Sequence, residues 1–242
     1  MEIKIDSGGQ MVDATLFPLQ KTGELRPAFV FFHGWTSRKD RHLIRAEKIA
    51  SLGVTTLVIS FRGHGESEGE FSKLSREDHL QDALASYDYL ASLPGVDPKR
   101  IGVFGSSYGG YIASVLSGER PVEYLALWDP ALYKDQDFSI PTALLVDQNP
   151  DVFKQANLSP RENRALRAIS DFQGDLLIVR SGKADIVPLE TINNYLETAN
   201  KDRLTSVVIE GADHTMSDAK HNQEVVQTLY NWFKEKINRT PR

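Results

Sequence analysis

Residues 105–109 read Gly-Ser-Ser-Tyr-Gly and fit the pattern Gly-x-Ser-x-Gly, which is typical of a nucleophilic serine on a tight strand-to-helix turn. A strand-like apolar run precedes the motif and a helical run follows it. The turn brings the positions two before and two after the nucleophile together, so both must be small. Glycines flank Ser107 in this way, whereas Phe104 and Tyr108 flank Ser106. The motif therefore predicts Ser107 as a nucleophile rather than a glycine-rich turn without chemistry.

A serine hydroxyl becomes a useful nucleophile only when a neighbouring base takes its proton. His214 follows the strand-like residues 206–209 through a short loop, which places it at the same edge of the predicted sheet as Ser107. His33 and His64 precede the serine in glycine-bearing loops, where structural hydrogen bonds are expected. The remaining histidines lie in polar helical stretches and are expected to be solvated: His42, His79 and His221. The sequence therefore predicts His214 as the base.

The base needs a carboxylate on its second ring nitrogen, which fixes the tautomer and stabilises the imidazolium. Asp185 lies in a loop just after the strand-like residues 176–179, again at the catalytic edge, and is the predicted acid. Asp129, which ends the preceding strand, is the alternative. Asp213 is next to the histidine and would point the wrong way in an extended loop. If Asp185 has no catalytic role, it is expected to be a turn or helix N-cap residue before Pro188.

A serine hydrolase also needs donors for the oxyanion that forms on the substrate carbonyl. The backbone N–H of Tyr108 lies at the start of the predicted helix, where the helix dipole favours negative charge. The backbone N–H of Trp35 follows the strand-like residues 28–32 and is the expected second donor. These are backbone roles, so they constrain the two side chains little.

Strand-like apolar runs alternate with helical stretches along the chain. The runs lack polar alternation, which is typical of parallel strands buried on both faces. They are residues 3–5, 12–16, 28–32, 55–61, 101–104, 124–128, 176–179 and 206–209. The first two flank Ser-Gly-Gly-Gln and are expected to form an antiparallel edge hairpin. The pattern predicts an α/β domain with a mostly parallel, doubly wound sheet and helices on both faces.

Residues 130–158 interrupt this alternation, because the stretch after the strand at 124–128 is longer than one helix and two loops require. A helix is expected from Ser159 to about residue 170, since Ser-Pro-Arg-Glu has the spacing of a capping box. The insertion follows the carboxyl end of a strand, where α/β proteins bind ligands, so it is predicted to form a small cap on a single domain of residues 1–242. A surface excursion packed on the sheet edge is the alternative. The residues expected to line a substrate pocket are Trp128, Tyr133, Phe138 and Phe153.

Composition excludes several other kinds of chemistry. The chain has no cysteine, which rules out a thiolate nucleophile, a disulfide framework and a Cys-ligated zinc. Its formal net charge is −5 and its 28 lysines and arginines are scattered, so no nucleic-acid or anionic-membrane partner is expected. No apolar run approaches the roughly 20 residues of a membrane span, and residues 1–6 lack a signal-peptide pattern. A soluble, cytoplasmic protein with a small-molecule ester substrate, no metal and no cofactor is expected.

The order of serine, aspartate and histidine, with His-Gly-Trp at 33–35 before them, resembles the α/β-hydrolase superfamily. The loop at 62–67, Arg-Gly-His-Gly-Glu-Ser, is similar to one that recurs in its esterase and serine-aminopeptidase-like branches. The resemblance covers about residues 29–233 and fails in 130–158, the region that varies with substrate in this superfamily. It implies an α/β-hydrolase fold and a serine hydrolase that acts through an acyl-enzyme.

Hydrolysis of carboxylic esters is the expected activity, and a short, fixed cap is expected to limit the acyl groups to small and medium ones. A thioesterase or a peptidase stays open, because both use the same triad. A dehalogenase is disfavoured, since that branch has aspartate where this chain has Ser107. An interfacial lipase is disfavoured because the insertion carries charges at Lys134, Asp135, Asp137, Asp147 and Asp151. A ligand receptor that keeps the triad without turnover is the alternative from another class, since fold alone does not decide function.

Overall fold

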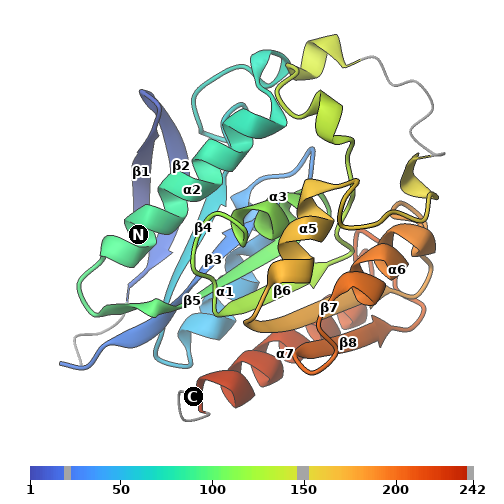
Figure 1. Ribbon diagram of the computed structural model, residues 1–242. Coiled ribbons are helices and arrows are strands. Elements are labelled where there is room, and N and C mark those ends of the chain that lie inside the picture. The colour runs from blue at the N-terminus through green and yellow to red at the C-terminus, as the bar shows by residue number, and fades with distance from the viewer. Residues whose placement is uncertain (19–22, 146–152, 239–242) are drawn as a thin grey trace.

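The computed structural model describes residues 1–18, 23–145 and 153–238, and a single eight-stranded sheet forms its centre (Figure 1). The strands are β1 (Glu2–Ser7), β2 (Gln10–Phe17), β3 (Arg26–Phe32), β4 (Thr55–Ser60), β5 (Val96–Ser106), β6 (Tyr124–Trp128), β7 (Asp175–Ser181) and β8 (Leu204–Ile209). Their order is β1-β2-β4-β3-β5-β6-β7-β8. The pairs β1–β2 and β2–β4 are antiparallel and the other neighbours are parallel. The predicted mostly parallel α/β sheet is confirmed.

The first two strands form the predicted hairpin at one edge of the sheet. Ser7 pairs with Gln10 across the turn, and the two residues between them have positive φ angles, 62° at Gly8 and 87° at Gly9. Two successive positive φ angles suit the turns that match the right-handed twist of paired strands, and glycine adopts them without strain.

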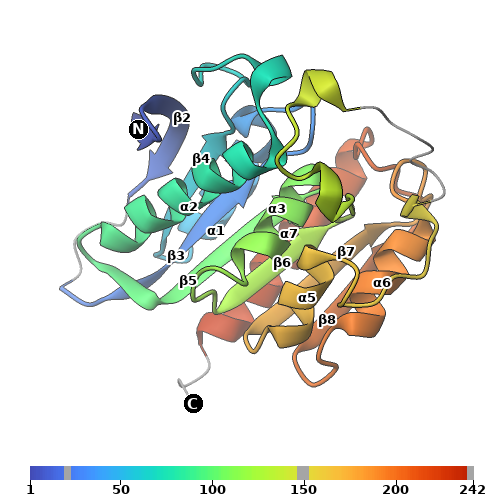
Figure 2. The same cartoon turned by 45° about the horizontal axis from the view of Figure 1, so that its top comes forward.

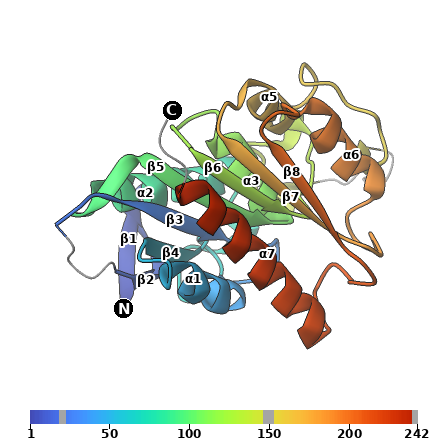
Figure 3. The same cartoon turned by 90° about the horizontal axis from the view of Figure 1, so that it is seen from below.

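Helices cover both faces of the sheet (Figures 1 and 3). On one face α1 (Leu43–Ala50) and α7 (Ala219–Ile237) lie side by side. On the other are α2 (Arg76–Ser92), α3 (Tyr108–Leu116), α5 (Arg164–Asp171) and α6 (Leu189–Thr198). Within the described ranges, no helix is long and apolar enough to cross a membrane.

The central strand β3 explains why the apolar runs are continuous. Phe29 and Phe31 pack with α1 and α7, whereas Val30 and Phe32 pack with the helices of the opposite face. Successive side chains of a strand point to opposite faces, so a strand covered on both sides needs an apolar residue at every position. The ring of Phe29 meets Phe233 of α7 edge-on, with 4.7 Å between centroids.

Two helix starts illustrate what local sequence decides. α2 begins with a capping box in which Ser75 accepts from the Asp78 backbone N–H and Asp78 accepts from the Ser75 backbone N–H. The helix expected from Ser159 begins later, because Asn163 is the N-cap of α5 and accepts from the N–H groups of the following turn. Ser159 still donates to the Glu162 carboxylate at 2.7 Å, but this contact closes a turn before the helix.

The described parts of the 130–158 insertion are anchored at two places. Near α2, the backbone N–H of Thr142 donates to the carbonyl of Leu74 at 2.9 Å, and residues 135–144 lie beside the start of that helix (Figure 2). Near α6, the Asn194 side chain accepts from the Leu158 N–H and donates to the Ala156 carbonyl, each at 2.9 Å. Asp147 and Asp151 lie outside the described residues.

Candidate active site

The carboxyl ends of four neighbouring parallel strands bring the candidate residues to one edge of the sheet. Ser107 directly follows β5 and Asp129 directly follows β6. Asp185 lies in the loop after β7, and His214 lies in the loop after β8. This edge is where open α/β sheets bind their ligands.

Ser107 sits at a strained turn between β5 and α3. Its φ is 52° and its ψ is −113°, in a region that residues with a side chain rarely adopt. A Cβ added to Gly105 would lie 2.1 Å from the carbonyl oxygen of Gly109. A Cβ added to Gly109 would lie 2.5 Å from the carbonyl oxygens of both Phe32 and His33. Both flanking positions therefore require glycine, as the motif predicts.

The imidazole ring of His214 contacts the carboxylate of Asp129. The distance from His214 Nδ1 to Asp129 Oδ2 is 3.2 Å. Asp129 is only 3% exposed, and its φ of 41° turns the chain sharply at the end of β6. Its carboxylate also accepts from the Ser181 N–H at 2.8 Å and from the Ser181 hydroxyl. An ionised carboxylate on Nδ1 makes this nitrogen the donor, which leaves the Nε2 lone pair free to take a proton.

Asp185, which the sequence favours for this contact, is wrongly placed for the imidazole ring. Its carboxylate Oδ1 accepts instead from the backbone N–H of His214 at 2.9 Å, and its side chain is exposed. Asp129, which the sequence leaves as the alternative, makes the contact with the imidazole ring of His214. The reason is tertiary: β6 lies next to β7, where Ser181 holds the Asp129 carboxylate, so the β6 turn reaches the ring.

The two backbone N–H groups expected to bind an oxyanion lie near Ser107, the candidate nucleophile. Tyr108 is the first residue of α3, where backbone N–H groups have no intrahelical acceptor. Among the residues that the structure describes, neither the Tyr108 nor the Trp35 backbone N–H has an acceptor. His64 Nε2 contacts the carbonyl oxygen of Trp35 at 2.6 Å and so ties down this loop. A Cβ added to Gly34 would lie 3.7 Å from the Cβ of Ser107, so this loop passes close to Ser107.

Buried histidines make hydrogen-bonding contacts near this edge of the sheet. His33 Nε2 accepts from the Phe61 N–H at 3.0 Å, and His79 Nδ1 contacts the Tyr108 hydroxyl at 2.6 Å. Burial lowers the pKa of both His33 and His79 to about 3, so both are neutral. His42 is also buried, and burial holds its pKa well below the usual range. The expectation of solvated side chains is therefore wrong for His42 and His79, whose helices turn these positions inward.

Ser107 and His214 line one open cleft of about 980 Å³. Trp128 lines it as expected, and Trp35 forms part of its wall. No hydrogen bond joins the serine to the His214 ring in the part of the chain that the structure describes. Such bonds are commonly long before substrate binds.

Three of the four residues predicted to line the substrate pocket are not among the described residues that line this cleft. Phe138 is 4% exposed and packs under the Arg164 guanidinium, with 3.6 Å from its carbon to the ring centroid. Phe153 is partly buried against the core on the α3 side. Tyr133 stacks behind Trp35, with 6.0 Å between ring centroids. The structure therefore does not place these three aromatic residues in this cleft: Phe138 is buried in the core, and Tyr133 and Phe153 are partly buried against it.

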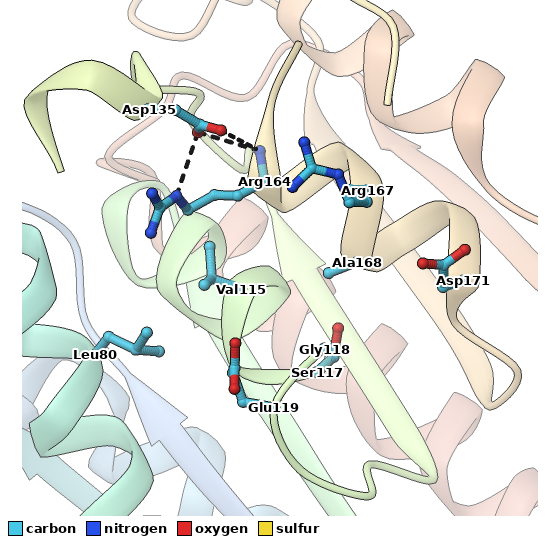
Figure 4. A pocket seen from close by; sticks show the side chains of 10 residues that line it. All are labelled: Leu80, Val115, Ser117, Gly118, Glu119, Asp135, Arg164, Arg167, Ala168 and Asp171. Atoms are coloured by element: carbon cyan, nitrogen blue, oxygen red, sulfur yellow. Dashed lines mark hydrogen bonds and ion pairs between the residues drawn. The ribbon is translucent and has the colours of Figure 1, made fainter. Parts of the chain in front are cut away.

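A second hollow, of about 470 Å³, lies between α3 and α5 and contains none of the candidate catalytic residues (Figure 4). Arg164 and Arg167 of α5 and Glu119 after α3 lie at its rim, and Asp135 is ion-paired with Arg164 at 3.4 Å. Its charged groups are of both signs, so it has no clear preference for a charged ligand.

The cleft also holds arginines that the sequence did not single out. Arg45 of α1 lines it, and so does Arg41, which lies in the 3₁₀ helix Lys39–His42 just before α1. Nothing in the residues around them in the chain marks these two positions. Among the described residues, no group of three or more histidine, aspartate and glutamate side chains is placed to hold a metal ion.

This architecture of sheet, serine turn and covering helices is an α/β-hydrolase fold. The chain belongs to the prolyl oligopeptidase family, whose model matches residues 42–240. An uncharacterized protein of Mycobacterium tuberculosis is 26% identical over 212 residues, which make up 85% of this chain and 69% of that protein.

Two solved structures illustrate the likeness in fold. Est1E from Butyrivibrio proteoclasticus, solved with bound ferulic acid, has a TM-score of 0.78 and 21% identity, over 98% of this chain and 100% of that one. XC6422 from Xanthomonas campestris, described as a serine hydrolase without a lid, has a TM-score of 0.71 and 16% identity, over 100% and 96%. At these identities the likeness shows the fold.

Proposed function

We propose that this chain is a serine hydrolase that cleaves carboxylic esters of small to medium acyl groups. The observation that carries the proposal is the meeting of a strained serine with a carboxylate-bound histidine in one cleft. Ser107 has a φ of 52°, His214 Nδ1 lies 3.2 Å from Asp129, and both the serine and the histidine line the same space. Strained backbone held by surrounding structure is typical of catalytic positions.

The proposed reaction begins when Ser107 Oγ attacks the ester carbonyl while His214 Nε2 takes its proton. The imidazolium that results donates from Nδ1 to Asp129, whose buried charge stabilises it. The substrate oxyanion accepts from the backbone N–H groups of Trp35 and Tyr108. As the tetrahedral adduct collapses, the C–O bond of the ester breaks and the alcohol leaves with the proton from His214.

The second half returns the enzyme to its starting state. A water molecule gives a proton to His214 and attacks the acyl carbonyl, and the acid leaves as Ser107 Oγ regains that proton. Asp185 holds the backbone of His214 through its N–H, so we assign it a positioning role.

The proposal is tested by active-site labelling together with turnover. A fluorophosphonate should modify Ser107, located by mass spectrometry, and the protein should hydrolyse 4-nitrophenyl acetate over many turnovers. Ser107→Ala should lose both, whereas Ser106→Ala is the matched control and should keep both. Labelling without repeated turnover would point to a ligand receptor. Full activity in Ser107→Ala would show that Ser107 is not the nucleophile.

A peptidase is the second candidate, because the family model that matches most of the chain is that of prolyl oligopeptidases. The same groups can cleave an amide, whose poorer leaving group depends more on protonation by His214. Comparing kcat/KM on 4-nitrophenyl esters and on the 4-nitroanilides of the same acyl groups separates the two. We expect the esters to be preferred.

A further inference from the structure

A buried arginine, Arg45, lines the cleft that contains Ser107 and His214, which we call the nucleophile cleft, and it has no carboxylate among the described residues to neutralise it. Arg45 of α1 is 4% exposed, and its guanidinium carbon lies 4.8 Å from the centroid of the Trp128 ring. Its Nη1 donates to the Arg41 carbonyl at 2.6 Å, and its Nη2 donates to the Asn222 side chain. Burial and the nearby Arg41 charge lower its pKa to about 10, so it stays cationic near neutral pH.

The hydrogen-bonding capacity of Arg45 is mostly unused. A guanidinium has five N–H donors, and the described residues supply acceptors for two of its groups. The Nε atom is buried and has no partner. In the described part of the chain no aspartate or glutamate forms an ion pair with Arg45 or with Arg41. A buried charge without a counter-charge is costly, so a ligand that supplies one is favoured.

This cation is close to the nucleophile. The Trp128 ring stacks on the Arg45 guanidinium, and the Trp128 carbonyl accepts from the Ser107 backbone N–H at 2.8 Å. Arg41 and Arg45 line the same cleft as Ser107 and His214. A substrate with its ester at Ser107 therefore has both arginines in the same cleft.

The charge of the cleft is opposite to that of the whole chain. Among its described lining residues, the charged side chains are Arg38, Arg41, Arg45 and Asp40, and Asp40 is already paired with Arg38 at 2.6 Å. The whole chain has a formal net charge of −5. A local excess of positive charge beside Ser107 attracts anionic substrates, whereas a neutral ester gains no such attraction.

We propose that Arg45, with Arg41, binds a carboxylate on the substrate, so that the preferred esters carry a second, ionised carboxyl group. This inference rests on the proposed ester hydrolysis and names its substrate class. The planar guanidinium suits a carboxylate because it offers parallel donors. The carboxylate can belong to the acyl part or to the alcohol part of the ester, and the two are distinguished by experiment.

A purely structural role for Arg45 makes a different prediction. Through Asn222 and Trp128 the side chain links α1 to α7 and to β6. If that were its whole role, removing the charge would lower activity on neutral and anionic esters alike. The ratio of the two activities is therefore the informative quantity.

The test uses matched pairs of substrates. For the acyl side, mono-4-nitrophenyl adipate is compared with its methyl ester, and for the alcohol side, 4-acetoxybenzoate with 4-acetoxybenzamide. In at least one pair we expect kcat/KM to be about tenfold or more higher for the anion. Arg45→Met should reduce this ratio by about tenfold or more, and Arg41→Gln should reduce it less, because Arg41 is exposed.

Arg167→Met is the matched control. It removes the same charge from an exposed position on α5, at the second hollow, and should leave the ratio unchanged (Figure 4). Equal use of both members of both pairs by the unmodified protein would overturn the proposal. An Arg45→Met variant that loses activity equally on both members of a pair would also overturn it.

A binding measurement keeps this inference separate from ester hydrolysis and from any failure of Arg45→Met to fold. Adipate should bind to the Ser107→Ala protein in calorimetry, and Arg41→Gln in that background should weaken the binding. Adipate binding without turnover of any ester would support the carboxylate site and contradict the proposed ester hydrolysis. Ester turnover with neither binding nor inhibition by adipate would support ester hydrolysis and contradict the carboxylate site.

Discussion

The carboxylate of Asp129 and the imidazole of His214, 85 residues apart in the chain, meet at 3.2 Å between Oδ2 and Nδ1. A second carboxylate, that of Asp185, accepts from the backbone N–H of the same histidine at 2.9 Å. The Asp129 carboxylate contacts the imidazole ring of His214, whereas the Asp185 carboxylate binds the backbone of the loop that carries His214.

We expect Asp129→Asn to lower kcat by roughly 10²–10⁴, because the amide can no longer fix the tautomer of His214 or stabilise its positive charge. Asp185→Asn keeps an acceptor oxygen for the His214 backbone and should cost about tenfold or less. Steady-state kinetics on 4-nitrophenyl acetate compares the two. The opposite ranking would mean that Asp185 reaches the ring during catalysis.

We expect His64→Ala to lower kcat with a smaller change in KM. His64 contacts the Trp35 carbonyl at 2.6 Å, so its removal loosens the loop that presents the Trp35 N–H. Donors to the oxyanion act mainly in the transition state, and losing one commonly costs about a hundredfold, so a misplaced donor should cost about tenfold or more. His221→Ala, at a half-buried position in α7, is the control. An effect confined to KM would contradict this role for His64.

Stability should fall between pH 7 and pH 5 because of the neutral buried histidines. The pKa of His33 and of His79 is about 3 in the folded state, below the ordinary value of about 6.5 that applies after unfolding. The unfolded chain therefore binds more protons in this range, and the stability present above about pH 6.5 is lost as the pH falls towards 3. At pH 5 the loss is about 2 kcal/mol for each histidine.

The variant that checks this linkage is His79→Gln. Its free energy of unfolding, measured in urea at pH 7 and at pH 5, should differ by about 2 kcal/mol less than that of the unmodified protein. His221→Gln serves as the comparison, since this side chain is half-buried. An unchanged pH dependence in His79→Gln would mean that the pKa of His79 is the same in the folded and the unfolded protein.

We expect Phe138→Ala to destabilise the fold by about 3–5 kcal/mol rather than to enlarge the substrate site. The ring is 4% exposed beneath Arg164 and is not among the described lining residues of the nucleophile cleft. The ratio of kcat/KM for nitrophenyl butyrate and acetate should stay constant while the urea midpoint falls. Leu144→Ala, at a residue 67% exposed, should change stability little. A shift towards longer acyl chains would return Phe138 to the substrate pocket.

Local pattern was enough to predict the fold class, the tight turn at Ser107 and the edge of the sheet at which His214 lies. The glycines at 105 and 109 meet a steric demand that arises within five residues, and the continuous apolar strands follow from burial on both faces. Because parallel strands place their carboxyl ends at one edge, the order of the strands also brought His214 to the edge that holds Ser107.

The choice among side chains that reach the same edge was decided only by tertiary structure. Asp129 and Asp185 both follow strands that end there, and the positive φ at Asp129 and the donors of Ser181 direct the first to the imidazole ring. Burial likewise depends on contacts between distant segments, which is why Phe138 packs in the core. For the same reason, Arg45 lies buried beside the nucleophile without a carboxylate, and nothing in the residues around it in the chain specifies that position.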